Sequence, residues 1–169
     1  MSKVNFEDRV VIITGAGNGL GKSYALELAN RGAKVVVNDL GGSMDGSGSG
    51  NSPADDVVDE IKSKGGEAVA NYDSVATKEG GEAIVSSALD TYEKLDAVIN
   101  NAGILRDRIF HKMTEEDFDA VVAVHLKGCF NVSRAAAGEF RNQSNGAFVH
   151  MTSTSGLIGN FGLVNYGAA

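Results

Sequence analysis

The sequence predicts an α/β protein built on a doubly wound parallel sheet of about five strands. Short apolar runs alternate along the chain with segments in which apolar residues recur at helical spacing. This alternation is typical of β-α-β units, whose right-handed crossovers place helices against the faces of a sheet. A glycine-rich turn follows the first apolar run. With 169 residues, the chain is long enough for one domain with a proper core and too short for two of ordinary size.

The composition excludes several classes of function. A net charge of −7 argues against a nucleic-acid partner, because phosphate backbones are bound chiefly by lysine and arginine. No apolar run is long enough to cross a bilayer, so membrane insertion is not expected. The three histidines share neither a helix face nor a ligand spacing, so no metal site is expected. Cys129, the only cysteine, is expected to be a small buried apolar residue in a reducing compartment.

The first β-α unit carries the glycine-rich turn. An apolar strand at 10–13 precedes the stretch TGAGNGLG at 14–21, and helical spacing follows over 22–31. Such a turn brings bare backbone close to a diphosphate, and the helix start offers unpaired N–H groups and a positive dipole end. Leu20 stands where the third glycine of G-x-G-x-x-G would fall, so a flexible glycine loop without a ligand is the alternative. The candidate cofactor residues here are Thr14, Gly15, Gly19, Leu20 and Gly21.

The second strand, at 34–38, ends at Asp39, about 20 residues beyond the glycines. A carboxylate there accepts hydrogen bonds from both hydroxyls of an adenosine ribose and repels a 2′-phosphate, so NAD is favoured over NADP. Residues 40–51 are rich in glycine and serine and are expected to form a mobile surface loop that does not order itself by burial. This loop either folds over a ligand or is an uninvolved insertion, and both interpretations stay open.

The remaining segments continue the alternation. Helices are expected from Ser52-Pro53 to the Gly65-Gly66 pair, over 78–92 and over 114–140, and strands at 67–71, 95–99 and 146–153. Ligands in such sheets lie beyond the carboxyl ends of the strands, where Gly15, Asp39, Asp73 and Asn100 are expected to stand. For Asp73, a turn or cap carboxylate is the alternative.

Together these motifs resemble the short-chain dehydrogenase/reductase family, whose fold is a Rossmann-type sheet. The resemblance rests on the TGxxxGxG turn, on Asn100-Asn101-Ala102-Gly103, and on Ser153 and Tyr166, in the family's order and spacing. Longer strings look like the (3R)-hydroxyacyl-CoA dehydrogenase domains of type 2 peroxisomal multifunctional enzymes: VNDLGG at 37–42, ANYDSV at 70–75, NAGILRD at 101–107 and GNFG at 159–162. The resemblance covers essentially the whole chain, read as one NAD-binding domain over 1–169.

The resemblance implies NAD-dependent oxidation of a (3R)-3-hydroxyacyl-CoA to the 3-ketoacyl-CoA in fatty-acid β-oxidation. Tyr166 would be the general base, and Ser153 would orient the same substrate oxygen. The implied cofactor contacts are Thr14, Gly15, Gly19, Leu20, Gly21, Asp39, Asp73, Ser74, Asn100, Ala102, Gly103 and Tyr166. A homodimer and a peroxisomal location are implied in the same way. The alternatives are a ketoacyl reductase or hydroxysteroid dehydrogenase on the same fold, and a non-catalytic NAD-binding or dimerisation module.

Three positions depart from the family pattern. His125 stands where many members have a catalytic asparagine; it is expected to be held by packing, while its carbonyl can anchor a water. Leu163 replaces a polar residue common shortly before the tyrosine. The family's active-site lysine would be residue 170, so these residues are expected to be the amino-terminal part of a larger enzyme. Without that lysine, the phenol of Tyr166, with an ordinary pKa of about 10, is a poor base, and we expect weak NAD binding and negligible turnover.

Overall fold

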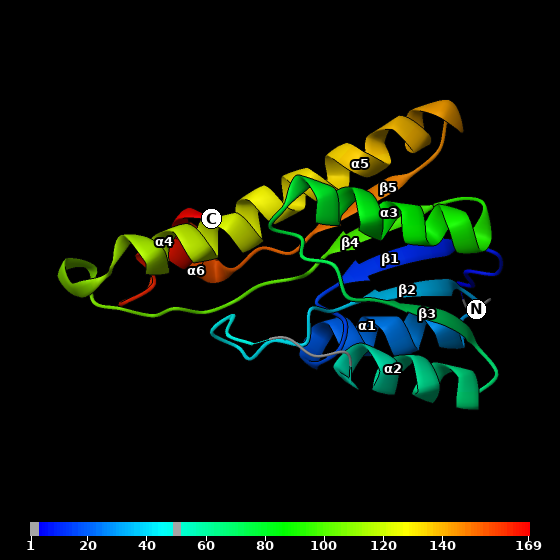
Figure 1. Cartoon of the computed structure of the whole chain (residues 1–169), viewed down its shortest axis with the longest axis horizontal. Helices are drawn as coiled ribbons and strands as arrows, with labels where there is room; N and C mark the ends of the chain where they lie inside the picture. Colours follow the sequence, from blue (N-terminus) through cyan, green and yellow to red (C-terminus); the bar gives the residue numbers. More distant parts are fainter. Residues whose placement is uncertain (1–3, 49–51) are drawn as a thin grey trace.

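Five parallel strands form one sheet in the order β3-β2-β1-β4-β5 in the computed structural model, which describes residues 4–48 and 52–169 (Figure 1). The strands are β1 (Val10–Thr14), β2 (Lys34–Asn38), β3 (Glu67–Asn71), β4 (Ala97–Asn100) and β5 (Ala147–His150). The helices are α1 (Gly19–Asn30), α2 (Ser52–Ser63), α3 (Lys78–Tyr92), η1 (Phe110–Lys112), α4 (Glu115–Val122), η2 (Ala123–Lys127), α5 (Gly128–Asn142), α6 (Thr154–Ile158) and α7 (Val164–Ala168). The predicted α/β fold with a Rossmann-type sheet is confirmed.

Helices cover both faces of the sheet (Figure 1). α1 and α2 pack on one face and α3 and α5 on the other, which divides the buried residues into two cores. In β1, Val11 and Ile13 face the first core, while Val10 and Ile12 face the second. Every residue of β1 is buried, as expected of a central parallel strand covered on both sides. Each such valine or isoleucine contributes about 1.5–3 kcal/mol through burial.

The sheet extends in opposite directions from β1. β2 and β3 lie on one side of it, and β4 and β5 lie on the other. Open α/β sheets bind ligands beyond the carboxyl ends of the strands, at the point where the strand order reverses. Thr14 ends β1 and Asn100 ends β4, so the reversal point lies beside these two residues.

Asp96 joins the amino-terminal ends of β1 and β4. Its carboxylate accepts a hydrogen bond from the Val10 N–H at 2.9 Å and pairs with Arg9 at 2.7 Å and Lys94 at 3.3 Å. Burial opposes ionisation, but the Val10 N–H and the two cations outweigh it and lower the pKa of this carboxyl below its ordinary value of 3.8.

Replacement of Asp96 by asparagine is expected to lower the free energy of unfolding by about 2 kcal/mol at neutral pH, because an ionised hydrogen-bond acceptor is lost. The folded-state pKa is depressed, so this stabilisation is present above the unfolded-state pKa and is lost as the pH falls through the folded-state value. Urea unfolding at a series of pH values should show the gap between wild type and variant narrowing below about pH 4. A gap that stays constant would contradict this assignment.

The helix expected over 114–140 is interrupted. α4 begins as predicted at Thr114, whose hydroxyl accepts from the Asp117 N–H at 3.1 Å, but the five residues of η2 then adopt π-helical bonding before α5 begins. A π-helical turn is wider than an α-helical one and is frequent at functional sites. Leu126 in η2 and Phe130 in α5 are 55% and 64% exposed.

β5 forms one edge of the sheet, and all four of its residues are exposed. Phe148 packs against Phe140 of α5 with ring centroids 4.9 Å apart, so α5 contacts β5 at this residue. The next exposed apolar side chains follow directly, at Val149 and Met151. The described structure therefore presents an uncovered strand edge with apolar side chains beside the carboxyl ends of β4 and β5.

Candidate functional site

A cavity of about 850 Å³ opens at the carboxyl ends of β4 and β5, beside the start of α1. The sequence-predicted residues that line it are Leu20, Asn100, Ala102, Gly103, Ser153 and Tyr166. Those that lie outside its wall are Thr14, Gly15, Gly19, Gly21, Asp39, Asp73 and Ser74. The structure thus gathers the expected catalytic pair with five of the twelve expected cofactor residues, Tyr166 among them, and leaves the other seven at the start of α1 and at the ends of β1, β2 and β3.

The turn between β1 and α1 is packed directly against the segment that follows β4. The Thr14 hydroxyl accepts from the N–H groups of Asn101 and Ala102, each at 3.0 Å. Gly15 has a φ of +62°, and a Cβ there would lie 2.8 Å from Ala102 Cα. A Cβ on Gly21 would lie 2.2 Å from the Gly15 carbonyl oxygen. These residues therefore shape the turn and hold it at the reversal point.

The start of α1 is open toward the outside of this turn. Gly19 has a φ of +54°, and a Cβ placed on it would meet no atom within 4 Å. Among the described residues, no side chain caps this helix: the Asn18 side chain makes no capping hydrogen bond, and the first turn has no acidic residue. The first N–H groups and the positive end of the helix dipole are consequently available to an anion such as a diphosphate.

Asp39 lies at the end of β2, next to the same turn. Its two carboxylate oxygens accept from the N–H groups of Gly17 at 2.8 Å and Gly41 at 2.7 Å. These bonds fix the carboxylate at the helix start, and each oxygen retains a lone pair for a further donor such as a ribose hydroxyl. The partnership of Asp39 with Gly17 was not anticipated, because strand and turn are 22 residues apart.

Asp73 and Ser74 are held in a local turn after β3. The Asp73 carboxylate accepts from the Asn71 side-chain amide at 2.8 Å, and the Asp73 N–H donates back to the same amide at 3.1 Å. The Ser74 hydroxyl accepts from the Ala76 N–H at 3.3 Å. This is the turn carboxylate that the sequence left open as the alternative for Asp73, and its side chain remains exposed for a ligand contact.

Asn100 is buried at the end of β4, with only 4% of its surface exposed. Its side-chain amide nitrogen lies 3.1 Å from the Ser133 hydroxyl on α5 and 3.3 Å from Nδ1 of His150 on β5. The amide is thus oriented by two neighbouring elements. His150 also lines the cavity, a position that the sequence did not indicate for it.

Ser153, directly before α6, and Tyr166, in α7, both line the cavity. The Ser153 hydroxyl oxygen caps α6 by accepting from the Ser155 N–H at 3.2 Å, which leaves its O–H free to donate to a substrate oxygen. Tyr166 lies in α7, and its ring stands edge-on to the His125 ring with centroids 5.1 Å apart. Among the described residues that line the cavity there is no lysine or arginine.

His125 contributes to the cavity wall from the π-helical η2. Its Nε2 lies 3.0 Å from the Ile104 backbone nitrogen and 2.9 Å from the Ile104 carbonyl oxygen. The ring fits because Gly103 has no side chain; a Cβ there would lie 2.4 Å from His125 Cε1. The sequence predicted a histidine held by packing, and the structure adds that this histidine fixes the backbone after β4 and contacts Tyr166.

Cys129 was expected to be a small buried residue; the structure shows it half-buried and lining the cavity. It is the second residue of α5, directly after the π-helical η2. Burial raises the pKa of the thiol above its ordinary value of 9.0.

Alkylation of Cys129 is therefore expected to be slow in the folded chain. The thiolate is the reactive form, and each unit by which the pKa rises removes about 90% of it. Labelling with a thiol reagent at pH 8 should run at least roughly tenfold slower than in denaturant and should slow further when NADH is added. Because the chain has a single cysteine, the labelled fraction reports this site alone. Equal rates in the folded and denatured chain would rule out the described burial.

Residues 40–48 form a hydrogen-bonded turn against the cavity segment, although their composition predicted a mobile loop. The Leu105 N–H donates to the Met44 carbonyl at 2.9 Å, and Arg106 Nε donates to the Asp45 carbonyl at 2.8 Å. The hydroxyls of Ser47 and Ser43 and the Ser47 N–H bond the Asp45 carboxylate and lower its pKa. Met44 lines the cavity, which favours the interpretation that this loop folds over a ligand. The rest of the predicted loop, residues 49–51, lies outside the described residues.

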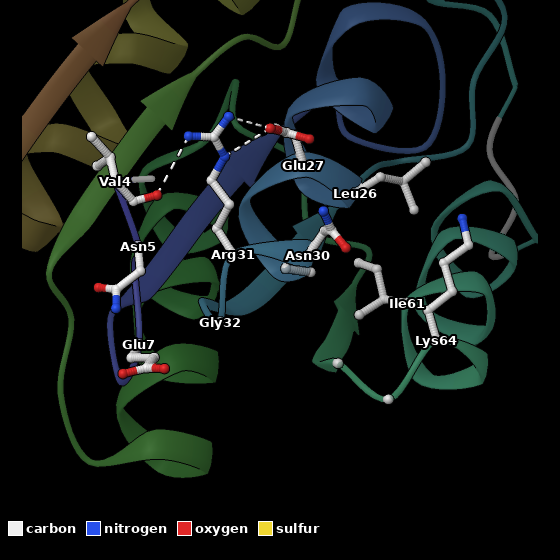
Figure 2. A pocket seen from close by; sticks show the side chains of 13 residues that line it. Val4, Asn5, Glu7, Leu26, Glu27, Asn30, Arg31, Gly32, Ile61 and Lys64 are labelled. Carbon is white, nitrogen blue, oxygen red and sulfur yellow. Dashed lines mark hydrogen bonds and ion pairs between the residues drawn. The ribbon is translucent and has the colours of Figure 1, made fainter. Parts of the chain in front are cut away.

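A second cavity, of about 540 Å³, lies at the amino-terminal ends of β2 and β3 and contains none of the predicted site residues. Figure 2 shows Arg31 in its wall, pointing toward Glu27 and the backbone oxygen of Val4. The Arg31 guanidinium is thus directed at the Glu27 carboxylate rather than at an open space. In the described part of the chain, no group of three or more His, Cys, Asp or Glu side chains has metal-binding geometry, and no helix is long and apolar enough to span a membrane.

Comparison with known proteins gives consistent matches. Residues 9–169 match the family model described as short chain dehydrogenase. A short-chain type dehydrogenase/reductase of Mycobacterium tuberculosis is 60% identical, over 96% of this chain and 57% of that protein. Peroxisomal multifunctional enzyme type 2 of mouse is 55% identical, over 99% of this chain and 22% of that protein. A 7α-hydroxysteroid dehydrogenase complexed with NADH and 7-oxo glycochenodeoxycholic acid superposes with a TM-score of 0.87 at 29% identity, over 97% of this chain and 60% of that chain. This chain therefore spans little more than half of the first relative and less than a quarter of the second.

Proposed function

This chain belongs to the short-chain dehydrogenase family, and on that premise we propose that it binds NAD and serves the oxidation of (3R)-3-hydroxyacyl-CoA to 3-ketoacyl-CoA. The observation that carries the proposal is the cavity beside the uncapped start of α1, which Ser153 and Tyr166 both line. An anion site and a proton acceptor at one sheet edge are what a dinucleotide-dependent oxidation requires.

The described residues fit NAD along the carboxyl ends of the strands. The open helix start at Gly19 suits the diphosphate, and Asp39 beside it suits the two hydroxyls of the adenosine ribose. We propose that the residues holding the cofactor are Thr14, Gly15, Gly19, Leu20, Gly21, Asp39, Asp73, Ser74, Asn100, Ala102, Gly103 and Tyr166. When bound, the nicotinamide ring supplies a hydride acceptor.

In the proposed mechanism, Tyr166 takes the proton of the substrate hydroxyl on its phenolic oxygen while the hydride leaves C3 of the substrate. Ser153 donates its O–H to the same substrate oxygen and orients it. A phenol with a pKa of about 10 is ionised in roughly one molecule per thousand at pH 7, and lowering that pKa by ~3 units requires about 4 kcal/mol of differential stabilisation. No lysine or arginine among the described residues lines the cavity, so these residues alone are expected to turn over slowly.

The acyl-CoA substrate is proposed from the sequence strings quoted above and from the high identity with peroxisomal multifunctional enzyme type 2. Apolar side chains that suit an acyl chain lie in the cavity wall, at Met44, Leu105, Leu126 and Leu157. A homodimer and a peroxisomal location are proposed on the same similarity.

A hydroxysteroid is the second candidate substrate, because the 7α-hydroxysteroid dehydrogenase is similar over nearly all of this chain. On this fold, an enzyme for a steroid and an enzyme for an acyl chain differ only in the pocket that receives the substrate. A non-catalytic NAD-binding module is the third interpretation.

The experiment that tests the proposal is a fluorescence titration of the chain with NADH, with NADPH in parallel. Saturable binding that is tighter for NADH is expected, because the Asp39 carboxylate repels a 2′-phosphate. NAD reduction is then followed in a chain extended beyond residue 169 to include the lysine expected at position 170, with a (3R)-3-hydroxyacyl-CoA, its (3S) epimer and a hydroxysteroid. The (3R) substrate is expected to give the fastest reduction of NAD. Preference for the steroid would favour the second candidate, and binding without reduction of NAD by any alcohol would favour the module.

A further inference from the structure

We propose that Asn165 is a positioning residue that holds Tyr166 in place at the cavity. This inference rests on the proposed role of Tyr166. The contacts of Asn165 that support it are observed independently of that role. Asn165 is completely buried, with 0% of its surface exposed, in a segment where its neighbours are exposed or half-buried. A buried amide is retained only where its donors and acceptor are satisfied, so its partners show what it does.

Both ends of the Asn165 side chain are bonded. Its Oδ1 accepts from the Tyr166 backbone N–H at 2.9 Å. Its Nδ2 donates to the carbonyl of Arg106 at 2.9 Å and to that of Asp117 at 3.2 Å. One side chain therefore ties the Tyr166 backbone to two segments that lie 48 and 59 residues earlier in the chain.

These two segments are themselves fixed. Arg106 belongs to the stretch after β4, whose neighbour Leu105 bonds the loop over 40–48. The Arg106 guanidinium also lies 3.8 Å from the Asp117 carboxylate of α4, and the Arg108 N–H donates to the Gly162 carbonyl at 2.9 Å. Asn165 thus anchors Tyr166 to the segment that follows β4 and to α4.

The start of α7 has no capping side chain at its N-cap position. Leu163, which precedes the first helical residue Val164, makes no side-chain capping bond, and Tyr166 lies in the first turn. The first N–H groups of a helix have no partner within the helix, and the Asn165 side chain supplies one for the Tyr166 N–H. The ring of Tyr166 is placed against His125, and this placement depends on how the backbone under it is held.

The test measures Tyr166 directly. The chain has four tyrosines and no tryptophan, so uniform 3-fluorotyrosine labelling gives a ¹⁹F spectrum with one resonance for each tyrosine, and Tyr166→Phe assigns the relevant one. In Asn165→Ala, the Tyr166 resonance is expected to shift and broaden, because its ring leaves the fixed edge-on contact with His125. The resonances of Tyr24, Tyr72 and Tyr92 are expected to stay unchanged. No cofactor or substrate is needed, so this result is independent of whether the proposed NAD binding is found.

Asn131→Ala is the matched control. Asn131 is also a buried asparagine, donating from Nδ2 to the Val75 carbonyl at 2.8 Å, but it lies against Gly81 of α3 and is not bonded to Tyr166. Both variants are expected to lower Tm by roughly 5 °C, since Asn131→Ala leaves one carbonyl without its donor and Asn165→Ala leaves two less buried ones. Only Asn165→Ala should move the Tyr166 resonance. An unchanged Tyr166 resonance in Asn165→Ala, with the same loss of Tm as the control, would overturn the proposal.

Asn165→Ser serves if the alanine variant fails to fold. A serine hydroxyl can still accept from the Tyr166 N–H as a short turn motif, but it does not reach the two carbonyls that Nδ2 bonds. The Tyr166 resonance is then expected to keep its position and broaden, because Tyr166 is no longer linked to the Arg106 and Asp117 carbonyls. A sharp resonance at the wild-type position in this folded variant would also overturn the proposal.

Discussion

Replacement of Gly21 by alanine is expected to abolish measurable NADH binding and to lower the free energy of unfolding by about 3 kcal/mol. The added Cβ would lie 2.2 Å from the Gly15 carbonyl oxygen and 2.6 Å from the Asn101 side-chain amide. Neither atom can move away freely, since one is backbone and the other donates to the carbonyls of Thr14 and Gly15 at 3.0 Å. The turn that offers its N–H groups to the diphosphate must therefore open. Urea unfolding and NADH fluorescence measure the two effects.

Gly138→Ala is the control for this prediction. Gly138 lies inside α5, and a Cβ there would meet nothing within 4 Å. Alanine is favoured over glycine in a helix interior, so this variant is expected to gain about 0.5–1 kcal/mol and to bind NADH unchanged. If Gly21→Ala is as stable as Gly138→Ala, the close packing of the turn described here is wrong.

Replacement of Asp39 by alanine is expected to change the ratio of NADH to NADPH affinity by roughly 100-fold or more. NADH loses charge-assisted hydrogen bonds worth about 1.5–3 kcal/mol each, and NADPH is freed from repulsion that reaches a few kcal/mol between charges about 4 Å apart. The variant also loses the acceptors of the Gly17 and Gly41 N–H groups, so part of the loss for NADH comes from a looser turn. Parallel titrations with the two cofactors separate the contributions, because a looser turn weakens both.

Asp56→Ala is the matched control, since it removes one negative charge from an exposed position on nearby α2. The two affinities are expected to keep their ratio in this variant, because long-range interactions of an exposed charge are screened by salt. An unchanged ratio in Asp39→Ala would show that Asp39 does not select the cofactor, and the proposed ribose contact would fall.

The strands and most helices follow from local properties of the chain. β1, β2 and β3 are continuous runs rich in valine, isoleucine or alanine, and α3 begins at Thr77, whose hydroxyl accepts from the Gly80 N–H at 3.1 Å. Such features depend on neighbouring residues, so pattern and capping predict them. The edge at which the candidate site lies is predictable for a similar reason, because parallel strands end at the same edge.

The details of the cavity wall are not local. The sequence predicted an uninterrupted helix through His125, and the structure has a π-helical turn there that brings His125 against Ile104 and Tyr166 and Cys129 into the cavity. Apolar spacing does not distinguish a continuous α-helix from one with a π-turn, since both keep their apolar residues at similar intervals. The loop over 40–48 differs from its prediction because the Leu105 N–H and the Arg106 side chain donate hydrogen bonds to its carbonyls, and composition does not report such partners.

By itself, therefore, the sequence determined the alternation of strands and helices and the glycine turn, because burial periodicity and backbone freedom are properties of short stretches. Asp39 followed from its spacing after the glycines, and Ser153 and Tyr166 followed from the family resemblance. Only the tertiary structure decided that Gly17 would hold Asp39, that His125 would face Tyr166 and that Asn165 would join three segments. Each of these contacts is a hydrogen bond or ring contact at a specific distance, and several connect residues far apart in the chain. Such contacts depend on how whole elements pack, which no local pattern contains.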